Sequence, residues 1–215
     1  MAKNIHWQDE YWLLLMQLYL KKPEGVKPLY SKGIVNLSME LHIPPQFLYE
    51  RMHELRRLDT PRMEKLWERY GSNPKRLAKG VKMLRQMKGL GNADDFYEGV
   101  EMHESFELDF KPIEENPRLT PVMLIIILDL YFRLTPNTMV KDTPEIQQLS
   151  RLLKIDTALI VEVMEIYQIC DPLLNRMEIL TSPLVTPCNN IWKRYGNGNP
   201  EKLAAYAAQL KDYFK

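Results

Sequence analysis

Apolar residues recur three and four positions apart along most of the chain, which is the spacing of one face of an α-helix. Leu48, Met52 and Leu55 form one such face. No segment keeps the alternation of apolar and polar residues that a strand requires, and the periodic segments are rich in helix-favouring Leu, Met, Glu, Lys and Gln. The pattern therefore predicts an all-α protein, with Leu48, Met52 and Leu55 in its core.

Helix starts are marked by a capping residue followed by proline, because proline suits the first helical position, where its missing N–H would have had no partner. We interpret six such pairs as helix starts: Thr60-Pro61, Asn73-Pro74, Thr120-Pro121, Thr143-Pro144, Thr186-Pro187 and Asn199-Pro200. Gly71 and Gly196 are typical helix ends. The predicted helices span about 8–22, 34–42, 45–58, 61–70, 74–88, 121–134, 144–154, 157–169, 173–178, 187–195 and 200–214.

Two parts of the chain match each other at an offset of 112 residues. The matched pairs include Leu18-Tyr19 with Leu130-Tyr131, Leu37-Ser38 with Leu149-Ser150, Ile43 with Ile155, and Met52 with Met164. After an insertion in the second part, Leu66-Trp67-Glu68-Arg69-Tyr70-Gly71 recurs as Ile191-Trp192-Lys193-Arg194-Tyr195-Gly196. We interpret the chain as two tandem copies of one five-helix module, and expect the recurring Trp and Tyr to be core anchors.

Charge divides the chain more sharply than its total of +1 suggests. Residues 1–90 carry a net charge of +8, residues 91–120 carry −7, and residues 121–215 are neutral. We therefore predict a basic module over 1–88, an acidic connector over 89–119 and a second module over 120–215. Within the connector, a capping residue and an acidic first turn predict one more helix at 93–104.

Segments Ile34–His42 and Pro45–Leu58 form a helix-turn-helix-like pair in the first module. The face of the second helix that lies opposite its apolar stripe carries side chains suited to base edges and phosphates: Gln46, Tyr49, His53, Arg56 and Arg57. Glu50 and Glu54 count against phosphate binding on this helix, and simple packing of two short helices is the alternative explanation.

The predicted helix 74–88 is strongly basic, with no acidic residue between Lys75 and Lys88. Its candidate phosphate contacts are Lys75, Arg76, Lys79, Lys82 and Arg85. The matched helices of the second copy lack this charge; opposite Tyr49, His53, Arg56 and Arg57 stand Val161, Glu165, Gln168 and Ile169.

Three alternatives stay open at this stage. The basic helix is either a nucleic-acid surface, a solvated face, or a surface covered by the acidic connector, whose carboxylates are Asp94, Asp95, Glu98, Glu101, Glu104, Glu107 and Asp109. The extra apolar residues Ile160, Val163 and Ile166 of the second copy fit either self-association or partner binding, or a larger core.

No motif for catalysis, metal binding or cofactor binding is found in the sequence. The four histidines form no ligand set, Cys170 and Cys188 form no paired motif, and no phosphate-binding glycine loop exists. The longest apolar runs are shorter than the ~20 residues that a membrane helix needs. We therefore expect a cytoplasmic, non-enzymatic protein with no cofactor, no metal and no membrane contact.

The second copy carries the motifs Leu128-Asp129-Leu130-Tyr131-Phe132-Arg133-Leu134, Thr143-Pro144-Glu145-Ile146 and Cys170-Asp171-Pro172. Their order resembles the helical module found beside HNH-type restriction endonuclease domains, over about 45 residues per copy. Because the His-Asn-His catalytic part is missing, the resemblance implies a DNA-associated module and no nuclease activity. The whole chain is similar to a family of uncharacterised proteins from Bacteroides-type bacteria, which implies a cytoplasmic bacterial setting.

The sequence thus predicts a non-enzymatic DNA-binding or regulatory protein that uses its basic first module. The alternative is a protein–protein adaptor whose basic face is covered by the acidic connector or by an acidic partner.

Overall fold

The computed structural model of the chain describes residues 7–87, 106–174 and 181–215. Over these residues all regular structure is helical, apart from one isolated bridge between Ile113 and Asn116. The all-α prediction is therefore confirmed.

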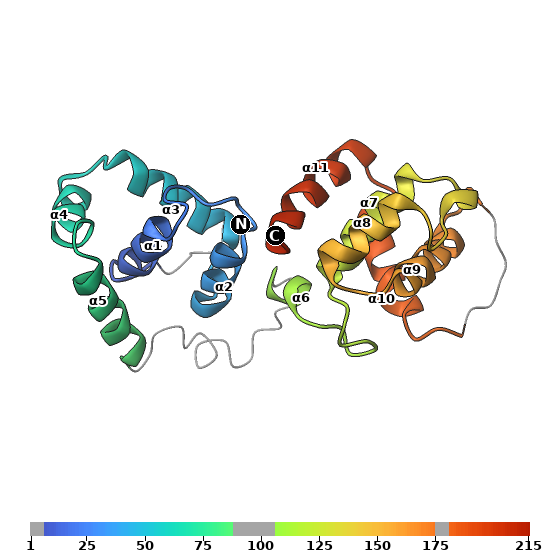
Figure 1. Cartoon of the computed structure of the whole chain (residues 1–215), viewed down its shortest axis with the longest axis horizontal. Coiled ribbons are helices and arrows are strands. Elements are labelled where there is room, and N and C mark those ends of the chain that lie inside the picture. Colours follow the sequence, from blue (N-terminus) through green and yellow to red (C-terminus); the bar gives the residue numbers. More distant parts are fainter. Residues whose placement is uncertain (1–6, 88–105, 175–180) are drawn as a thin grey trace. The chain divides into compact units, whose positions relative to one another are not determined.

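Internal contacts divide the chain into two compact units, Met1–Met102 and His103–Lys215 (Figure 1). Residues 106–119, which we had assigned to the connector, belong to the second unit, where the short helix α6 (Phe106–Phe110) packs on α7 (Pro121–Arg133). The helix expected at 93–104 lies outside the described residues.

Five helices build the first unit, and they follow the expected order. They are α1 (Tyr11–Leu20), α2 (Lys32–Leu41), α3 (Pro45–Arg57), α4 (Pro61–Tyr70) and α5 (Pro74–Gln86). Helix α1 is shorter than predicted at its C-terminal end because Pro23 disfavours helical geometry in the residue before it. The predicted starts of α4 and α5 are confirmed. Before each proline, the side chain of Thr60 or Asn73 caps the helix, because it accepts a hydrogen bond from the backbone N–H of Met63 or Arg76.

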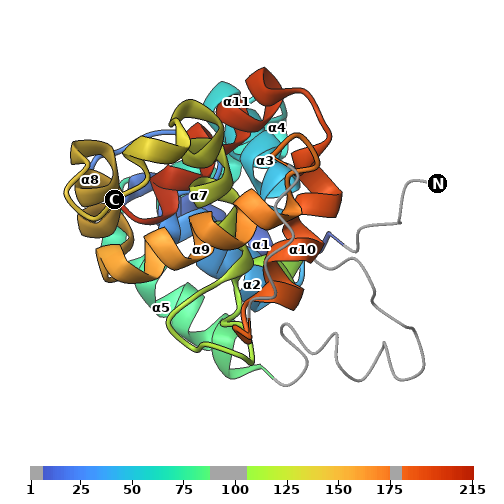
Figure 2. The ribbon, with the colours of Figure 1, turned by 90° about the vertical axis from the view of Figure 1, so that its right-hand side faces the viewer.

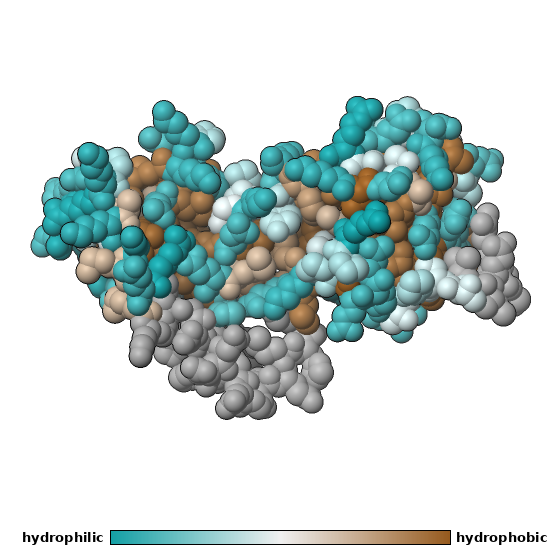
Figure 3. All heavy atoms as spheres, turned by 60° about the horizontal axis from the view of Figure 1, so that its bottom comes forward, coloured by the Kyte–Doolittle hydropathy of each residue, from teal (hydrophilic) through white to brown (hydrophobic). Residues whose placement is uncertain are grey.

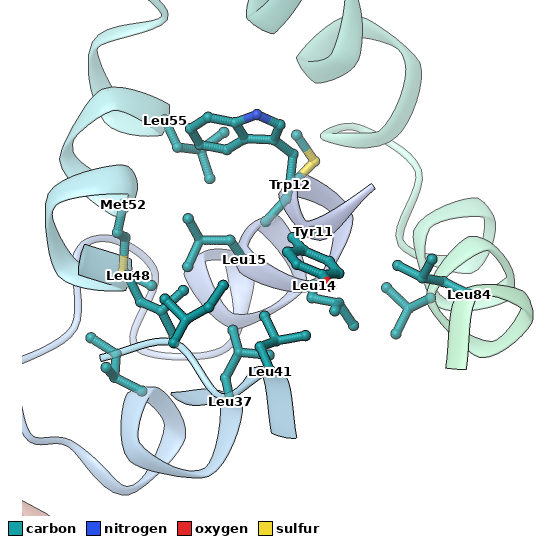
Figure 4. Packing of buried hydrophobic residues seen from close by; sticks show 14 of the residues in the cluster. Tyr11, Trp12, Leu14, Leu15, Leu37, Leu41, Leu48, Met52, Leu55 and Leu84 are labelled. Carbon is teal, nitrogen blue, oxygen red and sulfur yellow. The ribbon is translucent and has the colours of Figure 1, made fainter. Parts of the chain in front are cut away.

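Helix α1 lies at the centre of the first unit. Figure 4 shows Leu14 and Leu15 of α1 between α3 on one side and α5 on the other. The predicted core face of α3 is confirmed, since Leu48, Met52 and Leu55 are fully buried. On α5, the buried residues are Leu77, Val81 and Leu84. Helices α3 and α5 consequently turn their polar faces away from each other.

Helix α7 lies at the centre of the second unit. Helix α7 contacts α9 (Thr157–Cys170), α10 (Val185–Ile191) and α11 (Pro200–Leu210), as Figures 1 and 2 show. The unit also holds α8 (Pro144–Leu153), a π-helical turn at Trp192–Gly196, and 3₁₀ turns at Pro136–Thr138 and Lys211–Tyr213.

Two boundaries in the second unit differ from the prediction. Residues 173 and 174 form a turn, and residues 175–180 lie outside the described part. Helix α10 begins at Val185, so the proposed start at Thr186-Pro187 was wrong. Pro187 occupies the third helical position, where a missing N–H still costs no internal hydrogen bond.

Local structure recurs at the offset seen in the sequence. Helices α2 and α8 differ by 112 residues at both ends, and each is followed by a left-handed residue, His42 or Lys154. The Ser38 hydroxyl donates to the carbonyl of Ile43, and the Ser150 hydroxyl donates to that of Ile155. The interpretation of the two units as copies of one module stays a prediction, and these matched turns support it.

The orientation of α5 can be tested with two neighbouring residues. Leu84 is 6% exposed and Met83 is 59% exposed. We expect Leu84→Ala to lower the free energy of unfolding by about 2–5 kcal/mol, because it leaves a cavity beside α1. Urea denaturation measures the change; Met83→Ala is the control and should alter it by less than about 0.5 kcal/mol. Equal effects would contradict the orientation.

Two glycines of the first unit should respond to alanine in opposite directions. A Cβ at Gly71 would lie 2.7 Å from the carbonyl oxygen of Trp67, whereas at Gly80 the nearest atoms are 3.6 Å away. Gly71→Ala should therefore destabilise the unit by about 1–3 kcal/mol through overpacking. Gly80→Ala, inside α5, should stabilise it by about 0.5–1 kcal/mol. Thermal unfolding of both variants checks the signs, and stabilisation by Gly71→Ala would refute the close approach.

Candidate functional site

Most polar side chains on the outer face of α3 contact neighbouring side chains. The Gln46 amide donates to the Glu50 carboxylate at 2.9 Å, and the rings of Tyr49 and His53 meet edge to face at 4.7 Å. At the end of the helix, the Arg57 guanidinium lies 3.0 Å from the Asp59 carboxylate. Of the five candidates on this helix, Arg56 alone is an exposed cation without an ion pair among the described residues.

The five candidates on α5 divide by direction around the helix. Arg85 points toward α2, where its guanidinium donates to both Glu40 oxygens at 2.6 and 2.8 Å. These hydrogen bonds raise the pKa of Arg85. Arg76 lies over the Tyr70 ring, 5.6 Å from its centre. Arg85 is thus already paired, and Arg76 faces α4.

The three lysines of α5 lie on its outer face. Lys75, Lys79 and Lys82 are exposed, and the described part of the chain offers them no carboxylate partner. Because α3 and α5 lie on different sides of α1 (Figure 4), the structure does not bring the ten candidates into one patch. The lysine face of α5 is therefore one anion-binding candidate, and Arg56 on α3 belongs to another.

A basic surface on α4 escaped the sequence analysis. Arg62, Lys65 and Arg69 stand three and four residues apart, a spacing that would have revealed one common helix face. They border a hollow of about 320 Å³. Its lining is completed by Asp9, Glu10, Leu13, Leu66 and Tyr70. Hydrophilic side chains cover the end of the first unit where α4 lies (Figures 1 and 3).

A larger cleft, of about 560 Å³, opens between α1, α2 and α5. Its walls are mainly apolar and include Leu14, Leu18, Leu20, Leu37 and Leu77. Its polar lining residues are Gln17, Lys21, Glu24 and Asn36, together with the Arg85–Glu40 ion pair.

Two residues of the second unit that match candidates of the first unit point into their own unit. Gln168, which matches Arg56, is buried, and its amide nitrogen lies 3.2 Å from the Met139 sulfur. Ile160, Val163 and Ile166 are buried within their own unit, which favours the larger-core alternative over self-association through these residues. Lys211, which matches Arg85, lies 3.4 Å from the buried carboxylate of Asp129.

The recurring aromatic residues differ in burial between the units. Trp192 is buried among the rings of Tyr131, Phe132 and Tyr167, as expected of a core anchor. Trp67, its match in the first unit, is half-buried and meets only the Tyr19 ring among the described aromatic residues.

Groups capable of catalysis are scattered over the described residues. His42 ends α2 and His53 stands on α3, while His6 and His103 lie outside the described part. No metal-binding cluster of His, Cys, Asp or Glu occurs in residues 7–87, 106–174 and 181–215. Within the same residues, no helix is both long and apolar enough to cross a lipid bilayer.

No protein-family model, curated protein or solved structure matches the chain. The resemblances to the module beside HNH-type endonuclease domains and to the Bacteroides-type family therefore stay predictions.

The two cysteines provide a chemical test of the second unit. Burial raises the pKa of the Cys188 thiol to about 12, and burial also raises the pKa of Cys170. At pH 8 only about one Cys188 in ten thousand is a thiolate, so a disulfide reagent should leave it unmodified in the folded protein. Both thiols should react in urea. Rapid modification of Cys188 without urea would contradict its burial.

Proposed function

We propose that the chain is a non-enzymatic DNA-binding or regulatory protein whose first unit contacts the phosphate backbone through the outer face of α5. The observation that carries the proposal is the set of three exposed lysines on that face that have no ion pair with any described residue. Lysine contacts to phosphate release counterions, which makes such binding strong at low salt and independent of base sequence.

The comparison between the units supports this role. Lys79 and Lys82 are matched by Ala205 and Ala208, which are exposed as well. The lysines therefore serve no packing purpose that the fold requires, since the same helix positions tolerate alanine in the second unit. Charge at these positions is a property of the first unit alone.

Existing ion pairs reduce the number of side chains that we expect to contact phosphate. Arg57 and Arg85 each hold a carboxylate, so binding phosphate would require breaking an existing ion pair. We assign the principal phosphate contacts to Lys75, Lys79 and Lys82. Arg56, with Gln46, Tyr49 and His53 beside it on α3, forms a second and separate candidate surface for base edges.

The second candidate function is a protein–protein adaptor, whose basic face is covered by the acidic connector or by an acidic partner. Asp109, from the acidic stretch, binds Arg194 of the second unit and not the basic helix. Glu107 is buried in the second unit too, and the other five carboxylates of the stretch lie outside the described residues. Under this candidate the α5 lysines bind an acidic protein, and a DNA duplex does not bind even at low salt.

The test is fluorescence anisotropy of the full chain with a labelled mixed-sequence duplex, titrated at several salt concentrations. We expect the logarithm of the affinity to fall linearly with the logarithm of salt concentration. Replacing Lys79 and Lys82 with alanine should reduce the slope by about 1.8, at about 0.9 per lost phosphate contact.

The control removes the same charge elsewhere, by replacing the exposed Lys193 and Lys202 of the second unit with alanine. This variant should keep the parent slope. Absence of binding at low salt, or an unchanged slope in the Lys79 and Lys82 variant, would refute the proposal.

A further inference from the structure

The second unit shows how this fold holds an acidic segment. The Asp109 carboxylate in α6 accepts two hydrogen bonds from the Arg194 guanidinium, at 2.7 and 2.8 Å. Next to it, Phe110 is buried and its ring lies 5.2 Å from that of Tyr213. A forked ion pair thus fixes the segment's direction, while an aromatic ring provides apolar contact.

Arg194 is prepared for this contact by the residue that follows it. Its guanidinium lies over the Tyr195 ring, 5.1 Å from the centre, and donates to the Tyr195 hydroxyl at 3.1 Å. The hydrogen bonds with Asp109 raise the pKa of Arg194. Stacking holds the planar guanidinium in one orientation, so little freedom is lost when the carboxylate binds.

The first unit contains the same arginine–tyrosine pair. Arg69 lies over the Tyr70 ring, 5.5 Å from its centre, in the sequence that matches Arg194 and Tyr195. Arg69 is exposed, and no carboxylate among the described residues pairs with it. Arg76 stacks on the same Tyr70 ring at 5.6 Å, which adds positive charge to the site.

An apolar floor accompanies the cations. Leu13 and Leu66 line the hollow beside Arg69 and are half-buried. Their matches in the second unit, Ile125 and Ile191, are 0% and 3% exposed, and α6 packs on the helix that carries Ile125. The apolar surface of Leu13 and Leu66 is therefore partly exposed in the first unit, whereas the matching surface of the second unit is buried.

We propose that the α4 hollow of the first unit binds an acidic, aromatic-containing segment of a partner protein. A carboxylate of the segment pairs with Arg69, and an aromatic ring packs on Leu13 and Leu66. This inference goes beyond DNA binding and does not rest on it, because its residues lie on α4 and α1 and not on the lysine face of α5.

The chemistry of the hollow favours a peptide over a nucleic acid. Asp9 and Glu10 line the hollow, and Asp9 forms an ion pair with Arg62. These carboxylates repel a continuous row of phosphates, and a DNA backbone has no apolar group to place on the leucines. A short acidic segment needs one carboxylate on Arg69 and one ring, as α6 provides in the second unit.

The test uses a fluorescein-labelled synthetic peptide with the sequence of residues 106–112, capped at both ends, and the full-length chain. Anisotropy should show saturable binding below millimolar concentration. Arg69→Gln should weaken binding at least tenfold, while Lys32→Gln, which removes an exposed charge from α2 of the same unit, should leave it unchanged. Circular dichroism verifies that both variants fold.

Peptide variants locate the contacts on the probe. Replacing its aspartate with asparagine, or its last phenylalanine with alanine, should each weaken binding at least fivefold. Loss of peptide affinity in the variant lacking Lys79 and Lys82 would overturn the proposal, because it would indicate general charge attraction. Unchanged duplex binding by Arg69→Gln keeps this test separate from that of DNA binding.

Three further results would overturn the proposal. These are no peptide binding at millimolar concentration, equal binding by Arg69→Gln, and equal binding of the asparagine peptide. Sedimentation of the unlabelled chain gives the last criterion: self-association that Arg69→Gln abolishes would identify a second copy of this chain, and not a separate partner, as the occupant.

Discussion

Each unit depends on burying one almost wholly apolar helix at its centre. In α7, every residue from Leu124 to Leu128 is fully buried, and in α1, Leu15 and Met16 are fully buried. A helix that is apolar on nearly all sides must be covered on nearly all sides. The surrounding helices accordingly turn their leucines, isoleucines and methionines inward, and this requirement decides which of their polar residues reach the surface.

The central helices of the two units differ in whether they carry a buried charge. In the second unit Asp129 of α7 is buried, and it is paired with Arg133 at 2.8 Å and with Lys211 of α11 at 3.4 Å. A buried carboxylate needs such partners, because an unpaired charge in the interior is strongly destabilising. Arg133 and Lys211 therefore hold the buried carboxylate of the second unit.

In the first unit the residue that matches Asp129 is the uncharged Gln17. Arg85 of α5, which matches Lys211, is paired with Glu40 of α2 and not with a residue of α1. On α4, Arg69 is exposed, whereas the matched Arg194 of the second unit is paired with Asp109. Lys79, Lys82 and Arg69 of the first unit thus stand where the second unit has Ala205, Ala208 and the paired Arg194.

Much of the fold could be predicted from local chemistry. Capping residues before proline located most helix starts, and the spacing of Leu48, Met52 and Leu55 identified the core face of α3, because both signals act within one or two helical turns. The ion pairs of Arg85 and Arg194 could not be predicted. Arg85 and Glu40 are 45 residues apart, and Arg194 and Asp109 are 85 apart, so only tertiary packing brings them together. The segment 106–119 was misassigned for the same reason, since its acidity did not reveal that Phe110 is buried.

The central claim is that Lys79 and Lys82 of the first unit are exposed and have no ion pair among the described residues, whereas Lys211 of the second unit is paired with Asp129. The rate of acetylation of each lysine in the native chain, followed by mass spectrometry, measures this most directly. Lys79 and Lys82 should react at the rate of an exposed amine, and Lys211, 26% exposed and paired with Asp129, should react several-fold more slowly until the chain is unfolded. Equal rates at Lys79, Lys82 and Lys211 in the folded protein would contradict the claim.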